Sequence, residues 1–326
     1  MSRLQPTPAR KPKTIDLAAA PSPSPPAWPS YTGVSQYVGT SSNGRVAVFV
    51  DPTLGDPGLL NVQDLLADAD RVVALNDQIF GTSSGSVQVI VFALGGQTDG
   101  TGGADHMGCD YVSGAAIEVC ASFGQSARCS ALFEAELSEC AMNGNLCGLS
   151  TGEALSRWCT MATNPGALSD FASAPTWAAD GMPNFVDTTD PTDQNYDSIG
   201  CGMAFLSWLQ SMKQGLSTIA QEMVKLGNSG TLAMLYAALT GDASSNAWTK
   251  FRAAIQALQF GVTSDDPFAG ASPVPVPAPT PGGPATLANA QAWASAGIAT
   301  GDPLQTIETA QGLASQGLAQ NWPTSS

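Results

Sequence analysis

The sequence is poor in charge, in histidine and in long apolar runs. Only 12% of its 326 residues are charged, and His106 is its single histidine. One histidine excludes the most familiar metallopeptidase signature, which places two histidines in one helix. No apolar run approaches the roughly 18 residues that a membrane span needs. We therefore expect no membrane span and no standard zinc peptidase.

The charges that are present are strongly unbalanced. The chain has 27 acidic and 12 basic residues, which gives a net charge of −15 at pH 7. Four of the bases stand within the first thirteen residues, so the remainder carries 8 − 27 = −19. Such a surface repels phosphates and anionic lipids, and we expect the main body not to bind nucleic acid.

The composition is typical of an extracellular protein, because lysine is scarce and glycine, serine and threonine are abundant. The N-terminal stretch does not show a secretory signal. Its only apolar run is Leu17–Ala20, whereas such a signal needs roughly 7–15 apolar residues. We expect an extracytoplasmic or secreted protein without a recognisable signal peptide.

Seven cysteines are present, and six of them fall between Cys109 and Cys159. No pair has the Cys-x-x-Cys spacing of a zinc knuckle or a redox motif. One interpretation is a set of disulfides that link the middle of the fold, with Cys109–Cys120 as one candidate pair. The other is that the cysteines are small buried apolar residues. The sequence leaves both open.

The pattern of apolar residues predicts an α+β fold, with an N-terminal mixed β-sheet and helices followed by an all-helical part. Residues 45–50 and 87–94 are predicted strands, and 59–80 is a long amphipathic helix between them, which makes a right-handed βαβ unit. Residues 95–108 are expected to form a glycine-rich loop and 111–120 a hairpin. Further helices are expected over 125–142, 151–161, 202–212, 216–226, 231–239 and 246–258.

The predicted organisation has four parts. Residues 1–40 are expected to be a disordered leader rich in proline and serine, and 41–268 the folded domain. A proline-rich linker follows over 269–285, and a short alanine-rich helical tail over 286–326.

Three short motifs follow one another in the predicted domain. Residues 131–141 read Ala-Leu-Phe-Glu-Ala-Glu-Leu-Ser-Glu-Cys-Ala, and residues 148–158 read Gly-Leu-Ser-Thr-Gly-Glu-Ala-Leu-Ser-Arg-Trp. Residues 193–197 read Asp-Gln-Asn-Tyr-Asp and lead into Ala-Phe-Leu-Ser-Trp at 204–208. Together they resemble the zincin metallopeptidases, particularly those like the plant basic secretory proteins. In that family a mixed sheet precedes a helix bearing HExxH, a second helix supplies a further ligand, and a tyrosine-bearing loop opens a later helix.

The resemblance implies roles for particular residues. The two ligand histidines fall on Ala135 and Glu139, and Glu136 matches the catalytic glutamate. Glu153 stands where the later metal ligand is expected, and Tyr196 matches the tyrosine of the third motif. Alanine cannot ligate zinc, so the loss of both histidines argues against a normal zinc hydrolase.

Three hypotheses of function follow. The leading one is a catalytically degenerate, peptidase-like protein that acts by binding a protein or peptide partner, with no cofactor. The second is an unconventional hydrolase in which Glu136, Glu139 and Glu153 form a carboxylate cluster that shifts their pKa values or gathers Ca²⁺ or Mg²⁺. His106 and Tyr196 are further catalytic candidates there. The third is a structural protein, or a homo-oligomer, that docks through its C-terminal tail.

Three further patterns have a functional and a structural interpretation. His106, beside Asp105, is either a catalytic or ligand histidine or a loop residue with local hydrogen bonds. Residues 148–152 match G-x-S-x-G, but no strand precedes them and no histidine follows, so a helix cap is the better interpretation. Four aspartates, at 187, 190, 193 and 197, are expected to brace turns rather than to form a calcium loop.

Overall fold

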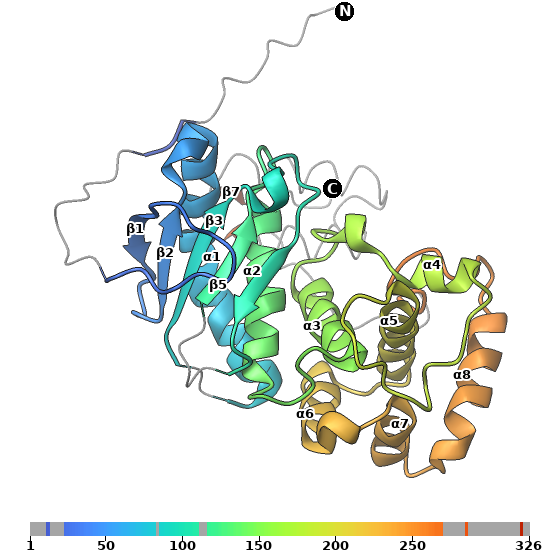
Figure 1. Ribbon diagram of the computed structural model, residues 1–326. Coiled ribbons are helices and arrows are strands. Elements are labelled where there is room, and N and C mark those ends of the chain that lie inside the picture. The colour runs from blue at the N-terminus through green and yellow to red at the C-terminus, as the bar shows by residue number, and fades with distance from the viewer. Residues whose placement is uncertain are drawn as a thin grey trace, which may run out of the picture.

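A computed structural model of the chain describes residues 11–13, 23–82, 85–110, 116–269, 284–285 and 320–321. Its ribbon has a half that contains a β-sheet and a half made of helices, which lie side by side (Figure 1). The predicted α+β class, with an N-terminal mixed sheet, is therefore confirmed. Most of the predicted linker and tail lies outside the described residues, as does any docking through the tail. Within them, β6 (Pro284–Ala285) pairs antiparallel with β7 (Gln320–Asn321).

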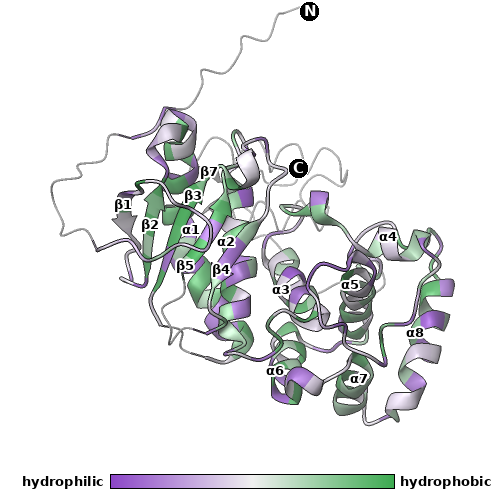
Figure 2. Cartoon of the chain, in the orientation of Figure 1, coloured by the Kyte–Doolittle hydropathy of each residue, from purple (hydrophilic) through white to green (hydrophobic). Residues whose placement is uncertain are grey.

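The main sheet has five strands in the order β1-β2-β3-β5-β4. The three central strands are parallel, and the two edge strands run antiparallel to their neighbours. The strands are β1 (Gln36–Thr40), β2 (Val46–Val50), β3 (Val87–Phe92), β4 (Ala104–Met107) and β5 (Ala116–Cys120). The central strands consist largely of buried apolar residues, as parallel strands covered on both faces require (Figure 2).

Two long helices cover one face of this sheet. They are α1 (Gly55–Phe80), which links β2 to β3 as predicted, and α2 (Ser126–Ala141). Valines of the strands and leucines of both helices form one apolar core between the two layers. Helix α1 begins at Gly55 rather than at Leu59, because Pro57 fits the first turn of a helix, where its missing N–H has no helical partner.

The N-terminal segment covers the other face of the sheet. Trp28 packs edge-on against Phe49, and Tyr31 packs against Phe92. The expectation that residues 1–40 form a disordered leader is wrong for residues 28–40, which pack on the sheet or form β1. The proline- and serine-rich composition of this segment indicated disorder. A few aromatic residues are nevertheless enough to cover an apolar sheet face.

The edge strand β4 corrects one prediction. Residues 95–108 were expected to be a loop, but 104–107 form a strand that pairs with β5, with His106 opposite Ile117. The predicted hairpin partner at 111–112 lies outside the described residues. A four-residue edge strand carries few ladder bonds and no apolar run, so its sequence signal is weak.

The second half of the domain consists of helices around a central one. That central helix is α5 (Tyr196–Ser211), whose residues from Ser198 to Leu209 are all buried. Trp158 and Trp208 are buried, and Trp208 stacks on Tyr236. The surrounding helices are α3 (Ser150–Thr163), α4 (Ala174–Ala179), α6 (Leu216–Leu226), α7 (Leu232–Thr240) and α8 (Ala247–Gln256). Short 3₁₀ turns occur at Pro52–Leu54, Leu94–Gly96, Ser169–Phe171, Gly227–Ser229 and Ser244–Asn246.

One disulfide is present among the seven cysteines, all of which the structure describes. It joins Cys109 to Cys147, whereas the candidate pair Cys109–Cys120 is wrong. Cys120 and the four remaining cysteines are buried free thiols. In the part of the chain that the structure describes, no helix is long and apolar enough to cross a membrane.

Candidate functional site

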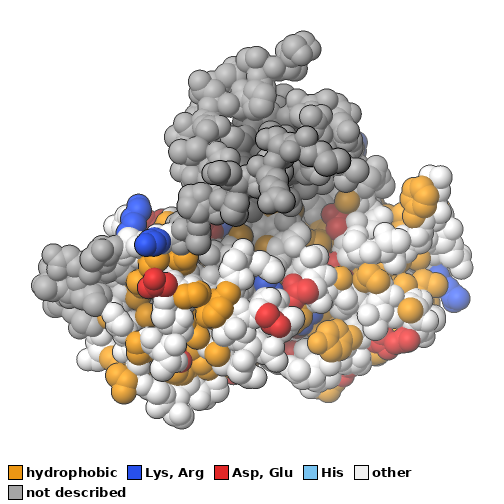
Figure 3. Space-filling model, turned by 90° about the horizontal axis from the view of Figure 1, so that it is seen from above, with side chains coloured by type: hydrophobic (Ala, Val, Ile, Leu, Met, Phe, Trp, Pro, Cys, Tyr) orange, Lys and Arg blue, Asp and Glu red, His pale blue; other side chains and the backbone are white. Residues whose placement is uncertain are grey.

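A cavity of about 470 Å³ opens between β4, α2, α3 and the start of α5. All six residues that the sequence singled out line it, although they come from four separate elements. They are His106, Ala135, Glu136, Glu139, Glu153 and Tyr196. Seen from above, acidic and basic side chains gather near the centre of the molecule, where the two halves meet (Figure 3).

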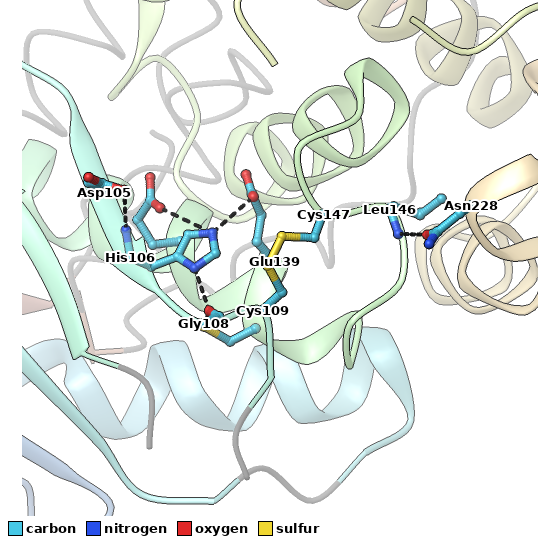
Figure 4. The surroundings of a disulfide bond; sticks show 10 residues. Asp105, His106, Gly108, Cys109, Glu139, Leu146, Cys147 and Asn228 are labelled. Carbon is cyan, nitrogen blue, oxygen red and sulfur yellow. Dashed lines mark hydrogen bonds and ion pairs between the residues drawn. A yellow bond between two sulfur atoms is a disulfide. The ribbon is translucent and has the colours of Figure 1, made fainter. Parts of the chain in front are cut away.

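His106 is the centre of the polar contacts in this cavity (Figure 4). Its Nδ1 lies 2.6 Å from the carbonyl oxygen of Gly108, so this nitrogen is protonated and donates. Its Nε2 lies 3.2 Å from Oε2 of Glu139 and 3.9 Å from Oε2 of Glu136. Each ring nitrogen thus faces an acceptor, and both hydrogen bonds form only when both nitrogens carry protons. His106 is therefore an imidazolium.

The electrostatics agree with this charge. Burial alone lowers the pKa of His106, but hydrogen bonds with Cys140 and Glu139 and the charge of Glu136 outweigh it and raise the pKa to about 12. Burial raises the pKa of Glu139, but its hydrogen bonds with His106 and Glu153 prevail and bring that pKa below its ordinary value. His106 and Glu139 therefore form a buried ion pair, to which Ser156 adds a hydroxyl donor at 3.2 Å.

The other two glutamates are shifted the opposite way. Burial and then the charge of Glu139 raise the pKa of Glu136 well above its ordinary value. Burial raises the pKa of Glu153 to about 8, even though Arg157 lies 2.5 Å away and lowers it. Of these three glutamates, Glu139 is thus ionised at neutral pH, whereas Glu136 and Glu153 retain their protons.

Several lining residues were not predicted. Arg157 lies one helical turn beyond Glu153, and this i,i+4 spacing was a signal that sequence reasoning did not use. Phe171 has guanidinium groups of Arg128 and Arg157 over its ring, at 4.9 and 5.5 Å from the centroid. Ser30, from the N-terminal segment, also lines the cavity, and nothing in the sequence indicated its position.

A second cavity of about 510 Å³ adjoins the first, and Phe171 and Tyr196 line both. Tyr196 is the first residue of α5 and remains 53% exposed. Asn195 holds this position, since its side chain caps α5 by accepting from the N–H of Asp197 at 3.1 Å. The tyrosine is therefore presented at the mouth of the site.

Two of the four aspartates of the preceding loop brace turns, as expected. Asp190 accepts from Asn195, and Asp187 accepts from Asn184, while Asp193 lines the cavity. The G-x-S-x-G pattern forms no nucleophile elbow, since Ser150 is buried at the start of α3. The predicted helix cap is also wrong in detail, because no side chain among the described residues caps α3. The Ser150 hydroxyl accepts from the N–H of Asp190, and the buried hydroxyl of Thr151 has no hydrogen-bond partner in the described part of the chain.

The residues at the predicted metal position do not suit a zinc ion. Ala135 has no donor atom for a metal ion. The Nε2 proton of His106 points at Glu139, and the guanidinium of Arg157 contacts the carboxyl group of Glu153, so neither glutamate is free to bind a metal. Among the described residues, no group of three or more histidine, cysteine, aspartate or glutamate side chains is arranged to hold a metal ion. The carboxylate cluster of Glu136, Glu139 and Glu153, proposed for Ca²⁺ or Mg²⁺, is therefore not among such groups.

Comparison with protein-family models finds no match, and no curated protein is significantly similar to this chain.

Proposed function

We propose that the protein is a zincin-like domain in which the imidazolium of His106 stands in place of a zinc ion, and that it acts by binding. The observation that carries this proposal is the 3.2 Å contact between His106 and Glu139, the residue that matches a ligand histidine of the family. The order of elements supports it as well. A mixed sheet leads to α2 with Glu136, then to α3 with Glu153, then to Tyr196 at the start of α5, and these residues share one cavity.

The charge of the cavity favours a cationic ligand. Five carboxyl groups line it, from Asp105, Glu136, Glu139, Glu153 and Asp193, against the two cations His106 and Arg157. Both cations already contact glutamates. Glu136 and Glu153 hold protons at neutral pH and can release them when a cation approaches. A lysine or arginine side chain would meet the excess of carboxyl groups and the exposed ring of Tyr196, which can contact a cation through its face. The partner is thus a basic segment of a protein or peptide.

The disulfide supports a location outside the cytoplasm, since such bonds persist in oxidising compartments. A secreted or extracytoplasmic binding protein is the form of this proposal that agrees with the composition.

The test combines metal analysis with binding. We expect purified protein to hold no stoichiometric zinc and to leave casein intact. Calorimetry should show binding of a lysine-rich peptide and none of a glutamate-rich peptide of equal length. Asp193→Asn should weaken binding, whereas Glu222→Gln, which removes the same charge beside Lys225 on α6, should not. Stoichiometric zinc with casein cleavage, or equal binding of both peptides, would overturn the proposal.

A second candidate is metal-independent hydrolysis, and the opposite pKa shifts within the carboxylate cluster favour it. Glu139 is ionised, and Glu153 retains its proton to a pKa of about 8, so a proton acceptor and a proton donor stand side by side. Here Glu153→Gln, which removes the proton donor, should abolish turnover of a peptide substrate without unfolding the protein. Turnover that survives this substitution would exclude the candidate.

A further inference from the structure

The disulfide spans the two sides of the cavity. Cys109 follows β4 and stands three residues after His106, whereas Cys147 lies between α2, with Glu136 and Glu139, and α3, with Glu153 (Figure 4). The bond therefore ties the segment that carries the imidazolium to the loop that joins the helices carrying the carboxyl groups.

The contacts next to Cys109 act directly on the imidazole. The carbonyl oxygen of Gly108 accepts the Nδ1 proton of His106 at 2.6 Å, and the carbonyl of Cys109 accepts from the N–H of Gly144 at 2.6 Å. β4 is only four residues long and lies at the edge of the described sheet. A short edge strand with one neighbour opens easily. The disulfide at Cys109 therefore contributes much of the restraint on the positions of Gly108 and His106.

The disulfide is accessible while the other cysteines are not. Cys109 and Cys147 are half-buried, whereas the five free cysteines are buried. Burial raises the pKa of Cys140, the thiol nearest to Gly108, so it is a poor nucleophile. A soluble dithiol thus reaches the Cys109–Cys147 bond before it reaches any buried thiol.

We infer that the Cys109–Cys147 disulfide is a redox-sensitive positioning element that holds His106 against Glu139, and that its reduction releases the imidazole and disables the cavity. A dithiol supplies two electrons and two protons. The sulfur–sulfur bond breaks, the thiols of Cys109 and Cys147 form, and the dithiol closes to its own disulfide. The consequence for ligand binding rests on the proposed function, whereas the release of His106 does not.

The single histidine makes this inference directly measurable. With ¹⁵N-labelled histidine, the oxidised protein should give one set of ring signals, including an Nδ1 proton protected by its bond to Gly108. Addition of dithiothreitol should abolish that protected proton signal and move the ring signals to those of a solvated imidazole. Reduction confirmed by mass after alkylation of two sulfurs, with the Nδ1 proton still protected, would overturn the inference.

A matched variant controls for other effects of the reductant. The double variant Cys109→Ser/Cys147→Ser should show the released spectrum with and without dithiothreitol, and circular dichroism checks its fold. If that variant does not fold, reduction of the native protein followed by reoxidation replaces it, and the protected signal should return. Binding of the lysine-rich peptide is measured on the same samples. Absence of binding in both redox states contradicts the proposed function alone, whereas an unchanged Nδ1 signal contradicts the switch alone.

Discussion

At the scale of single residues, the charge of His106 governs the cavity. Its ring lies near two glutamates, and its side chain and that of Glu139 are each only 10% exposed. Without this cation, Glu139 would keep its charge beside Glu136 and Glu153 with only Ser156 and Glu153 as donors. A buried carboxylate that loses its partner lowers the free energy of unfolding, because its charge is then uncompensated. This penalty is larger than the net attraction within the intact pair.

We therefore expect His106→Asn to lower the free energy of unfolding at pH 7 by about 3 kcal/mol, as measured by urea denaturation. The matched control is Lys225→Gln, which breaks the exposed pair with Glu222 and should change stability by less than about 1 kcal/mol. Adding Glu139→Gln to His106→Asn should recover part of the loss, because no uncompensated charge remains. Equal stability of His106→Asn and the native protein would contradict the buried ion pair.

The two protonated glutamates give ligand binding a pH dependence. A cationic ligand favours the ionised forms of Glu136 and Glu153, so it must displace protons that they hold at neutral pH. The affinity for a lysine-rich peptide should rise by about tenfold between pH 6 and pH 8, since the peptide stays charged throughout. Calorimetry in buffers of different ionisation heats should also detect proton release. Affinity that falls over this range would contradict the assignment, and Glu153→Gln should flatten the profile.

At the scale of elements, the long periodic segments were predictable and the short ones were not. β2, β3, α1 and α2 have apolar patterns that extend over several turns or a whole buried strand, and all four were predicted near their observed positions. β4 has no such pattern, and the cover that Trp28 and Tyr31 give the sheet depends on contacts distant in sequence.

Several residues of the candidate site were indicated by the sequence, but their geometry was not. Spacing and resemblance indicated Glu136, Glu139, Glu153 and Tyr196, which the fold brings to one cavity. The pairing of His106 with Glu139 joins β4 to α2 across 33 positions, and no local pattern encodes it. The disulfide was missed for the same reason, because cysteine spacing alone does not determine pairing.

Helix α5 offers a test of the packing that presents Tyr196. A Cβ at Gly200 would lie 2.3 Å from the backbone oxygen of Ser173, which no side-chain movement relieves. Gly200→Ala should therefore lower the free energy of unfolding by about 2 kcal/mol, although alanine normally favours a helix. The control is Gly103→Ala, whose nearest neighbour, Phe171, lies at 3.9 Å, and it should change stability by less than about 0.5 kcal/mol. A stabilised Gly200→Ala variant would show that α5 does not pack this closely.

At the scale of the whole molecule, the buried titrating groups act in the same direction above about pH 5. Burial raises the pKa of Glu134 to about 7 despite its hydrogen bonds from Thr163 and Asn164, and that of Glu153 to about 8. Between their ordinary value of 4.5 and these values the folded state binds more protons, so stability falls as pH rises. The raised pKa of His106 adds a loss of stability as pH rises above 6.5. The lowered pKa of Glu139 adds a loss of stability as pH falls below 4.5.

Stability should thus be highest near about pH 5 and should decline toward pH 8, which thermal unfolding across pH 3–9 can measure. Glu134→Gln keeps a neutral side chain of the same shape and should remove about 2 kcal/mol of the decline between pH 5 and pH 7. A melting temperature that rises from pH 5 to pH 8 would contradict this set of protonation states.

Whether His106 replaces a zinc ion can be measured in the ¹⁵N spectrum of its ring at pH 8 in the presence of equimolar zinc. We expect both ring nitrogens to carry protons at a pH where an ordinary histidine is neutral, and the zinc to be removed by dialysis. A neutral ring with a deprotonated Nε2, together with one retained zinc ion per chain, would show that His106 serves a metal rather than replacing it.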